Sequence, residues 1–593
     1  MCGIAGAFFD IGDDTASPSQ AMARYMQLRG PDSEGAWHDP RGGLSFGHRR
    51  LSIIDLDARA NQPFVSQDGR SVIVFNGEIY NYQVLRDGLV QAGVQLKSKS
   101  DTEVVLELYR RQGPQALAQL RGMYAFAIWD IERRQLVLAR DPYGIKPLYL
   151  ARTAKGWMFA SQVKALMATG LVSDTVDSAG VAGFFLWGSV PSPRTLYQDV
   201  KSVPAGSYVV IDDMRQASKP VSFADISAPW RDLERPMGEV GAAVRDALLD
   251  TVSAHLVADV PVAVLLSGGV DSGVIAGLMA ERGQKIEGIT VRFREFAGTA
   301  RDEGPRADSI AAHYGIQMSP RLVGRDEFLG DVPAILGAMD QPSIDGVNTW
   351  FASKAVAERG YKVVLSGVGG DELFCGYTTF QTIPRTRRTI GGLARVPPLG
   401  ALARLSLSLA ADALRRPKLA ALGTLGGDWH GAYFVHRGVV MPNELAALMG
   451  AKPAADALEQ LAQDVPPALN ARCDAAAVAA LESTRYLQNQ LLRDSDWASM
   501  AHSLELRTPF VDWALLNRLA PFIGSFKDGK GKRILASAPA RPLPEAIVSH
   551  SKTGFGLPIG EWLSQLNFQA PPSMTGTWGR RWAWHVAKEF GVV

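Results

Sequence analysis

The sequence predicts two domains, and it places a doubly wound parallel α/β sheet in the second one. With 593 residues the chain is too long for a single hydrophobic core, so two or more domains are expected. A short apolar run at 260–266 leads into a Gly-rich turn, and apolar residues at helical spacing follow as far as Gly283. Strand-like and helix-like runs then alternate up to residue 365, which favours βα units and a parallel sheet.

The composition excludes several classes of protein. Hydrophobic residues make up 47% of the chain and charged residues 21%, and the formal net charge is +2. This balance gives no reason to expect nucleic acid or a membrane as a partner, and apolar runs such as 181–187 are far too short to span a bilayer. Three scattered cysteines do not make a disulfide framework or a Cys-rich zinc site. No secretory signal is visible, so the expected location is the cytoplasm.

The first candidate for a catalytic group is Cys2. Removal of Met1 would leave the free α-amine of Cys2 beside its own thiol, and part of that amine is neutral at pH 7 because its reference pKa is about 8. The amine could then act as the base for the nucleophile. The alternative is a small buried residue at the entry to a first strand, 4–9.

Later residues in this region also allow two interpretations. Arg50 stands in a strand-like run, where its guanidinium would suit a carboxylate. The pair Asn76 and Gly77 interrupts an apolar run and is a common signal for a tight hairpin. Asp101 opens a helical pattern, where it could serve only as an N-cap.

Together, these residues resemble the class II glutamine amidotransferase domain, an N-terminal-nucleophile (Ntn) glutaminase with an α+β sandwich fold. The resemblance runs from Cys2 to about Tyr208. It includes Arg-Gly-Pro-Asp at 29–32, Asn-Gly-Glu-Ile-Tyr-Asn at 76–81 and Arg-Asp-Pro-Tyr-Gly-Ile-Lys-Pro-Leu-Tyr at 140–149. Leu28 stands where the family usually has His, a departure that touches none of the roles below.

The resemblance implies a set of roles in glutamine hydrolysis. Cys2 would take the acyl group, while the Asn76 side chain and the Gly77 N–H would form the oxyanion hole. The same two residues also belong to the implied glutamine site. Its other members are Arg50 for the α-carboxylate and Glu78 and Asp101 for the α-ammonium group.

A linker is expected at 211–236, where the chain becomes polar and irregular and contains three prolines. The predicted domains are therefore a glutaminase domain at 1–210 and a second domain at 237–593. A helical pattern near 240–257 begins the second domain.

The motif Ser-Gly-Gly-Val-Asp-Ser at 267–272 follows the strand at 260–266 and opens a helix. This geometry collects phosphate, since unpaired backbone N–H groups meet the positive end of the helix dipole there. Asp271 suits a phosphate only if a divalent cation lies between them, as Mg²⁺ would. No Gly-Lys-Ser/Thr follows, so the motif is not a Walker A loop; a merely Gly-rich βα turn is the alternative. The motif resembles the pyrophosphate loop of the ATP-pyrophosphatase superfamily.

A second Gly-rich loop, Leu-Ser-Gly-Val-Gly-Gly-Asp-Glu at 365–372, follows the strand expected at 362–365. Ligands of doubly wound sheets lie at the carboxyl ends of the strands, where both loops fall. Asp371 offers a second oxygen ligand for Mg²⁺, so Asp271 and Asp371 are expected to hold a metal–triphosphate complex from two sides.

Both loops, with Ser-Met-Ala-His-Ser-Leu-Glu-Leu-Arg-Thr-Pro-Phe-Val-Asp at 499–512 and Lys-Thr-Gly-Phe at 552–555, resemble the glutamine-hydrolysing asparagine synthetases. The resemblance leaves 382–472 and the tail after 566 poorly covered. It implies an adenine nucleotide α-hydrolase-like domain in which Lys552 stabilises charge on the phosphates; a solvated surface lysine is the alternative. The implied ATP site is Leu266, Ser267, Gly268, Gly269, Asp271, Ser272, Val291, Ser366 and Gly367.

The implied reaction is the ATP-dependent amidation of a carboxylate through an acyl-adenylate, with AMP and pyrophosphate released and with ammonia passed inside the chain from Cys2. Coupling the two sites in one chain makes physical sense because the adenylate must be shielded from water. Glutamine and a carboxylate acceptor, first of all aspartate, are the expected substrates, ATP and Mg²⁺ the expected cofactors, and a homodimer is one possible assembly.

The sequence departs from the asparagine synthetase pattern on the acceptor side. Val368 stands where these enzymes typically have Glu, Trp497 and His550 each replace an Arg, Cys375 replaces a Gly, and the segment 340–349 differs. A paralogue that amidates another carboxylate, such as a sugar uronate or a biosynthetic intermediate, is therefore the alternative. A β-lactam-synthetase-like ring closer would not need the glutaminase residues, and a non-catalytic scaffold would be expected to lose Cys2 or Asp271.

Overall fold

The computed structural model describes residues 1–593 apart from 40, 232–238, 415, 465–468, 551–555 and 564–569. Its N-terminal part, residues 1–222, holds two six-stranded sheets with the strand orders β10-β8-β9-β1-β3-β2 and β12-β11-β7-β6-β5-β4. Every pairing in them is antiparallel. The strands are β1 (Cys2–Phe9), β2 (Ser33–Asp39), β3 (Leu44–Arg50), β4 (Phe64–Val65), β5 (Ser71–Ile79), β6 (Gly122–Asp130), β7 (Gln135–Arg140), β8 (Tyr149–Thr153), β9 (Gly156–Ala160), β10 (Val200–Ser202), β11 (Ser207–Ile211) and β12 (Val221–Ser222).

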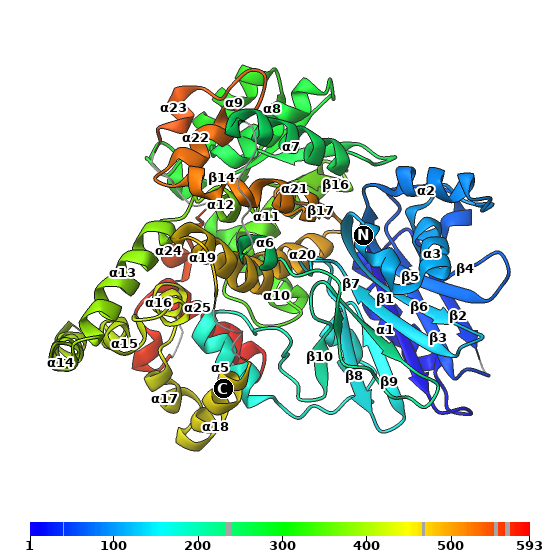
Figure 1. Ribbon diagram of the computed structural model, residues 1–593, viewed down its shortest axis with the longest axis horizontal. Coiled ribbons are helices and arrows are strands. Elements are labelled where there is room, and N and C mark those ends of the chain that lie inside the picture. The colour runs from blue at the N-terminus through cyan, green and yellow to red at the C-terminus, as the bar shows by residue number, and fades with distance from the viewer. Residues whose placement is uncertain (40, 232–238, 415, 465–468, 551–555, 564–569) are drawn as a thin grey trace.

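The two antiparallel sheets share one hydrophobic core. Ile4 and Phe8 of β1 pack in the same cluster as Val72 and Val74 of β5. The ring of Phe8 meets that of Trp129 on β6 edge to face, with centroids 5.1 Å apart. The N-terminal part is thus a sheet-on-sheet sandwich (Figure 1). Within it β1, which begins with Cys2, faces β5, which contains Asn76 and Gly77.

The C-terminal part, residues 239–593, contains the expected parallel sheet, with the strand order β15-β14-β13-β16-β17. All four pairings are parallel. The strands are β13 (Val262–Leu265), β14 (Glu287–Phe293), β15 (Gln317–Val323), β16 (Val363–Leu365) and β17 (Glu505–Arg507). The sequence interpretation placed a strand near each of the first four, whereas β17 lies in a motif that it had not assigned to the sheet.

Helices cover both faces of this sheet. Val264 and Leu365 point into a core shared with helices α7 (Val240–His255), α8 (Val270–Glu281) and α9 (Gly304–Tyr314). Ala263 and Val364 point the other way, into a core shared with α10 (Arg325–Ala338) and α11 (Val347–Glu358). This alternation along β13 and β16 is the side-chain period of a strand buried on both faces.

The remaining helices complete both parts of the chain. In the N-terminal part they are α1 (Ala16–Tyr25), α2 (Tyr82–Gln91), α3 (Asp101–Gln112), α4 (Val163–Met167) and α5 (Ser178–Trp187). In the rest of the described chain they are α6 (Ala228–Arg231), α12 (Gly370–Leu373), α13 (Thr379–Ala394), α14 (Pro397–Leu414), α15 (Pro417–Leu425), α16 (Trp429–Arg437), α17 (Leu445–Met449), α18 (Ala451–Gln463), α19 (Asp474–Leu481), the π-helix η6 (Glu482–Leu491), α20 (Leu492–Met500), α21 (Trp513–Leu519), α22 (Lys530–Ala536), α23 (Glu545–Val548), α24 (Ile559–Leu563) and α25 (Trp578–Glu589).

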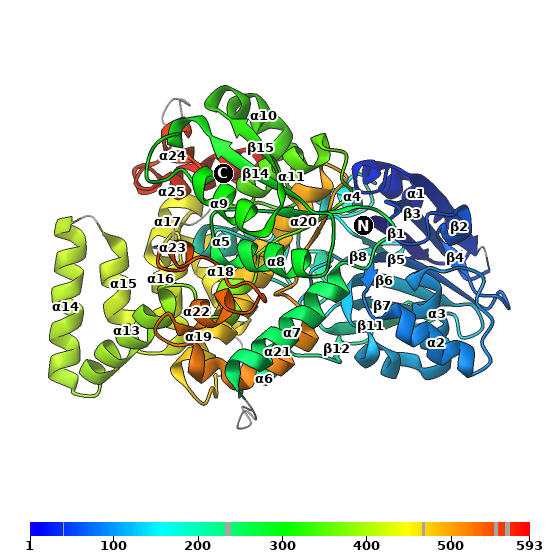
Figure 2. The ribbon, with the colours of Figure 1, turned by 90° about the horizontal axis from the view of Figure 1, so that it is seen from above.

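Two features of the helices stand out from the arrangement of the two parts. Helix α5 leaves the sandwich and packs against α18 in the core of the C-terminal part. Helices α13 to α15, which fill much of the poorly covered stretch 382–472, form an arm that projects on the side away from the sandwich (Figures 1 and 2). Among the described residues, none of these helices is both long and apolar enough to cross a membrane.

Candidate active sites

The candidate thiol lies where β1 begins. Cys2 is the register partner of Arg50, the last residue of β3, and it is only 7% exposed. Its backbone N–H donates to the Asn76 Oδ1 atom of β5 at 2.9 Å, across the sandwich. Burial raises the pKa of the Cys2 thiol, although the N-terminal ammonium group, the Leu51 N–H and Arg50 oppose that rise. The protein therefore brings the nucleophile predicted from the sequence next to two of its predicted partners.

Asn76 and Gly77 lie inside β5, so the hairpin reading of this pair is wrong. The strand continues through both residues because it pairs with β6 along its whole length. The Asn76 side chain is fully buried, and its Nδ2 donor has no hydrogen-bond partner among the residues that the structure describes. Gly77 has φ 153°, and a Cβ there would lie 2.1 Å from the Met123 carbonyl oxygen. Only glycine fits this approach, and the Asn76 donor stays available for a ligand.

Arg50 is held by the loop that follows its strand. Its Nη1 donates to the Asn61 Oδ1 atom at 2.8 Å, and its Nη2 donates to the Asp55 carbonyl at 2.6 Å. Further bonds run to the carbonyls of Asp57 and Ile54. In the described part of the chain Arg50 forms no ion pair with a carboxylate, so its charge is balanced only by neutral oxygens. A substrate carboxylate would meet a guanidinium that is already fixed in place.

Glu78 and Asp101 are buried carboxyl groups near the thiol site. Burial raises the pKa of Asp101 to about 6, against hydrogen bonds from the Ile79 and Thr102 N–H groups. Burial, with Glu505 and Asp101 nearby, raises the pKa of Glu78 well above its ordinary value. The N-cap reading of Asp101 does not hold, because Ser100 occupies the cap of α3 and its hydroxyl accepts from the Thr102 N–H.

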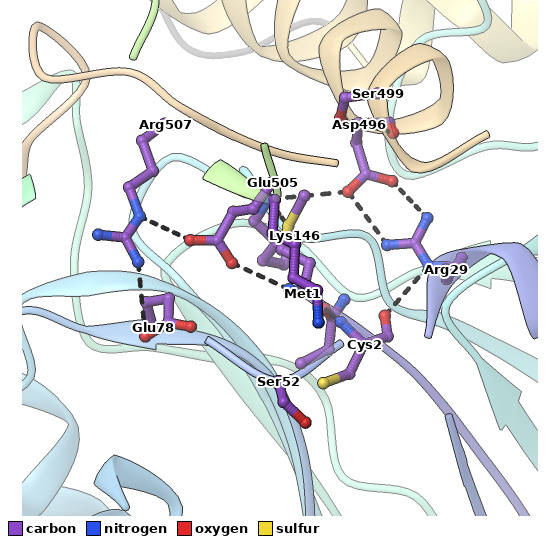
Figure 3. A network of polar contacts seen from close by, with 12 residues as sticks. Met1, Cys2, Arg29, Ser52, Glu78, Lys146, Asp496, Ser499, Glu505 and Arg507 are labelled. Atoms are coloured by element: carbon purple, nitrogen blue, oxygen red, sulfur yellow. Dashed lines mark hydrogen bonds and ion pairs between the residues drawn. The ribbon is translucent and has the colours of Figure 1, made fainter. Parts of the chain in front are cut away.

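A chain of buried charges joins the thiol site to the C-terminal part (Figure 3). The Met1 ammonium group pairs with Glu505 at 3.0 Å, and Arg507 pairs with Glu505 at 2.6 Å and reaches Glu78 at 3.7 Å. Arg29 donates to the Cys2 carbonyl and pairs with Asp496 of α20 at 2.7 Å. Lys146 approaches the same carboxylate at 3.8 Å. Residues of both parts therefore share one polar network beside Cys2.

A large cavity of about 610 Å³, called the main cavity here, opens at the carboxyl ends of the parallel strands. The loop after β13 and the loop after β16 both line it, as expected for neighbouring strands in a doubly wound sheet. It brings together all of the residues of the predicted ATP site and the second predicted metal ligand. They are Leu266, Ser267, Gly268, Gly269, Asp271, Ser272, Val291, Ser366, Gly367 and Asp371.

The two aspartates of the main cavity converge on one cation. The Lys532 ammonium group of α22 contacts Asp271 and lies 2.8 Å from Asp371. Because both carboxylates reach the same nitrogen, a divalent ion between them could contact both. Glycines make this convergence possible: a Cβ at Gly376 would lie 2.0 Å from Asp371, and one at Gly370 would lie 2.6 Å from Asp271.

The donor set fits Mg²⁺ bound together with phosphates. Mg²⁺ is commonly held by one or two carboxylates plus the oxygens of a bound nucleotide. Among the described residues no group of three or more His, Cys, Asp or Glu side chains could hold a metal alone. Asp271 and Asp371 would thus hold the ion only as part of a metal–nucleotide complex.

Sequence reasoning missed two cationic residues of the main cavity. Lys532 follows Gly529 and Gly531 at the start of α22, a Gly-and-Lys-rich stretch that could have drawn notice. Arg306 lies in the first turn of α9, the next α-helix after β14 in the chain, and its side chain packs over Gly268. Lys552, the lysine that the sequence did single out, lies outside the described residues.

The residues that depart from the asparagine synthetase pattern fall in and behind the main cavity. Val368, His550 and part of 340–349, including Asp345, line it directly. Trp497 is buried behind that segment, where it donates to Asp494 at 2.7 Å and packs against Gly346. Cys375 is buried. The substitutions therefore change one wall of the cavity, and Val368 leaves that wall without the usual carboxylate.

The sequence comparisons agree with the two-part architecture. Residues 1–221 match the glutamine amidotransferase domain family, and residues 243–570 match the asparagine synthase family. Asparagine synthetase [glutamine-hydrolyzing] 1 of Bacillus subtilis is 32% identical over 586 residues, which cover 95% of this chain and 88% of that protein. Asparagine synthetase B of Escherichia coli is 32% identical over 65% of this chain and 66% of its own. A protein named amidase chyE, from Penicillium rubens, is also 32% identical, over 64% of this chain and 60% of its own. The chain is a glutamine-dependent ligase and belongs to the glutamine-hydrolysing asparagine synthetase family.

Proposed function

We propose that this protein uses glutamine and ATP to amidate a carboxylate, forming AMP and pyrophosphate through an acyl-adenylate. The observation that supports this most is the main cavity, which gathers the whole predicted nucleotide site and aims Asp271, Asp371 and Lys532 at one point. The buried thiol with an unpartnered amide donor supports the glutaminase step.

In the glutaminase step the Cys2 thiol attacks the side-chain carbonyl of glutamine. The oxyanion that forms would be held by the Asn76 Nδ2 donor, which is buried without a partner, and by the Gly77 N–H. After Met1 is removed, the α-amine of Cys2 takes the thiol proton and passes it to the leaving ammonia. Arg50 would hold the α-carboxylate of the substrate, and ionised Glu78 and Asp101 its α-ammonium group.

In the adenylation step the acceptor carboxylate attacks the α-phosphorus of ATP in the main cavity. Mg²⁺ at Asp271 and Asp371 would neutralise charge on the phosphates. The Lys532 ammonium group, which now pairs with both carboxylates, would turn to the pyrophosphate oxygens once those carboxylates hold a cation. Lys552 is proposed for the same charge. Ammonia then displaces AMP and leaves an amide.

Aspartate is the first acceptor to consider, because relatives named asparagine synthetase align over most of the chain. A paralogue that amidates a different carboxylate is the second candidate. It is favoured by Val368, which cannot supply the carboxylate usual at that position, and by relatives named amidases.

The test separates the two steps. We expect the wild-type protein to release glutamate from glutamine, and Cys2→Ala to abolish that release, a loss of at least about a thousandfold. The same variant should keep carboxylate-dependent ATP–pyrophosphate exchange within about twofold, because Cys2 lies outside the main cavity. Asp271→Asn should abolish the ATP–pyrophosphate exchange and keep the release of glutamate from glutamine.

Mass spectrometry of the purified protein should find Cys2 as the first residue. Wild-type protein with a processed N-terminus and no glutaminase activity would contradict the first step. Wild-type protein without pyrophosphate exchange for any acid would contradict the second.

A further inference from the structure

A second, smaller cavity adjoins the main cavity. This side chamber has a volume of about 240 Å³ and shares Ile344, Asp345, Tyr486 and Trp578 with the main cavity. Of the residues assigned above to ATP or glutamine, none that the structure describes lines it. The side chamber therefore extends the adenylating site in a direction that neither substrate uses.

Segments far apart in the sequence build its walls. Helix α5 ends at Gly188 with φ 81°, and the Ile344 N–H donates to the Gly188 carbonyl at 2.9 Å. This bond holds Trp187, the last residue of α5, close to Ile344 in the middle of the acceptor-side segment 340–349. Another part of the lining comes from the π-helix η6, an uncommon element that often occurs at functional sites. The path of α5 into the C-terminal part thus supplies part of the lining of the side chamber.

Among the described residues, four aromatic side chains line the side chamber. Trp187 lies 6.1 Å from Tyr433 between ring centroids, and Tyr486 stands at the junction with the main cavity. Trp578 is 44% exposed, although it lies at the same junction. Aromatic side chains of this kind can stack on planar or sugar rings.

Two arginines line the side chamber, and they differ in their partners. Arg437 pairs with Glu482 at 2.9 Å and lies over the Tyr486 ring at 4.0 Å, so its charge is already balanced. Arg485 lies 5.9 Å from the centre of the Trp187 ring. Across the described ranges its guanidinium makes no hydrogen bond and no ion pair, and burial lowers its pKa. A guanidinium stays charged at neutral pH, so a largely buried one without an acceptor is costly until an anion arrives.

We propose that the side chamber binds the far end of the acceptor, and that this acceptor is a carboxylic acid with a ring and a second anionic group. The ring would stack on an aromatic side chain of the lining, and the anion would pair with Arg485. The carboxylate to be amidated would pass Asp345 and Tyr486 into the main cavity. Aspartate would leave the side chamber empty. The proposal rests on the proposed function, of which it names the acceptor class.

The test compares acids of matched design in ATP–pyrophosphate exchange, which reports adenylation alone. Glucuronic acid 1-phosphate and 4-carboxyphenylacetate both carry a ring and a second anion, on a sugar and on an aromatic ring respectively. Methyl glucuronoside keeps the sugar ring without the second anion, and aspartate has no ring. We expect at least one of the two dianionic ring acids to have a kcat/KM at least about tenfold above that of aspartate, and the better one identifies the ring type.

Arg485→Ala should raise the KM of the preferred dianionic ring acid about tenfold or more and that of methyl glucuronoside less than about threefold. The KM for ATP and the glutaminase rate should stay at the wild-type values. Trp578→Ala, at a partly exposed position, should weaken the binding of all ring acids without affecting folding. The matched control is Arg388→Ala, which removes an exposed arginine on α13 outside both cavities.

The outcomes separate this proposal from the proposed function. Exchange that prefers aspartate, with Arg485→Ala indistinguishable from Arg388→Ala, would overturn the side-chamber proposal and leave carboxylate amidation standing. Exchange with none of these four acids would overturn the side-chamber proposal, whereas the adenylation step would be contradicted only if no other carboxylic acid supported exchange either.

Discussion

The two candidate sites differ in how much room they contain and in what satisfies their charges. At the thiol site Cys2 is 7% exposed, and the charges around it pair with other protein groups in a buried network. The main cavity is open, with a volume of about 610 Å³, and glycine-bearing loops form much of its wall. Its two aspartates both pair with Lys532, which is itself partly exposed at the cavity.

Because of this difference, the two sites should tolerate different kinds of substitution. Removing the partner of a buried charge destabilises the fold strongly, because water cannot take the place of that partner. A charge at an open cavity can be solvated instead. Substitutions in the network beside Cys2 should therefore act mainly on stability. Substitutions in the main cavity should act mainly on catalysis.

The largest expected effect is that of Asp496→Ala on stability. This carboxylate balances Arg29 and Lys146, and all three side chains are buried. Removing it leaves two buried cations without their carboxylate partner, which should lower the free energy of unfolding by about 3–5 kcal/mol. A urea titration should show a lower midpoint. In Asp474→Ala, which breaks an exposed pair with Arg388, the cost should stay within about 1 kcal/mol. Equal midpoints for the two variants would remove the contrast between the sites.

A smaller effect, and one on catalysis, is expected for Lys532→Ala. The lysine contacts Asp271 and Asp371 inside the main cavity, and its charge should stabilise the phosphates during adenylation. Its loss should reduce kcat for ATP–pyrophosphate exchange by about a hundredfold to a thousandfold. Lys530→Ala, an exposed neighbour on the same helix, should stay within about twofold. Glutaminase activity should not change in either variant. Full exchange activity in Lys532→Ala would show that this lysine serves the fold alone.

The same contrast explains what could be predicted from sequence. The nucleotide end of the main cavity was predictable because Gly268, Asp271 and Asp371 lie in short motifs directly after strands, where local chain geometry decides the position of each side chain. The family-level organisation and the parallel sheet are confirmed. The roles of the single residues remain predictions.

What the sequence could not predict depends on contacts between distant segments. Lys532 reaches the cavity from a helix far along the chain, and nothing in its own neighbourhood names its two partners. Asn76 and Gly77 carry a local turn signal that β6 overrides by pairing with the whole of β5. The side chamber exists because α5 leaves the sandwich, which no periodicity in residues 178–187 indicates.

The smallest expected effect is a pH dependence confined to the thiol site. Burial raises the pKa of Asp101 to about 6, so its carboxyl group is protonated below that pH. Because we propose that the ionised form binds the α-ammonium group of glutamine, kcat/KM for glutamine hydrolysis should fall up to about tenfold per pH unit below about pH 6. The rate of ATP–pyrophosphate exchange should not show this fall below about pH 6. Asp271 and Asp371 outweigh the effect of burial and raise the pKa of Lys532, which therefore stays charged throughout.

Protonation of Asp101 should stabilise the folded protein while it lowers glutaminase activity. A loss of activity caused by titration can therefore be distinguished from one caused by unfolding. A carboxyl group whose pKa is raised in the folded protein favours the fold while it is protonated, and this contribution is lost as the pH rises through about 6. The loss of glutaminase activity between pH 6 and pH 5 should thus occur in fully folded protein and reverse on returning to pH 7, with an unchanged circular dichroism spectrum. A glutaminase profile that stays flat over this range would place Asp101 outside the binding of glutamine, and the thiol site would then lose its second carboxylate.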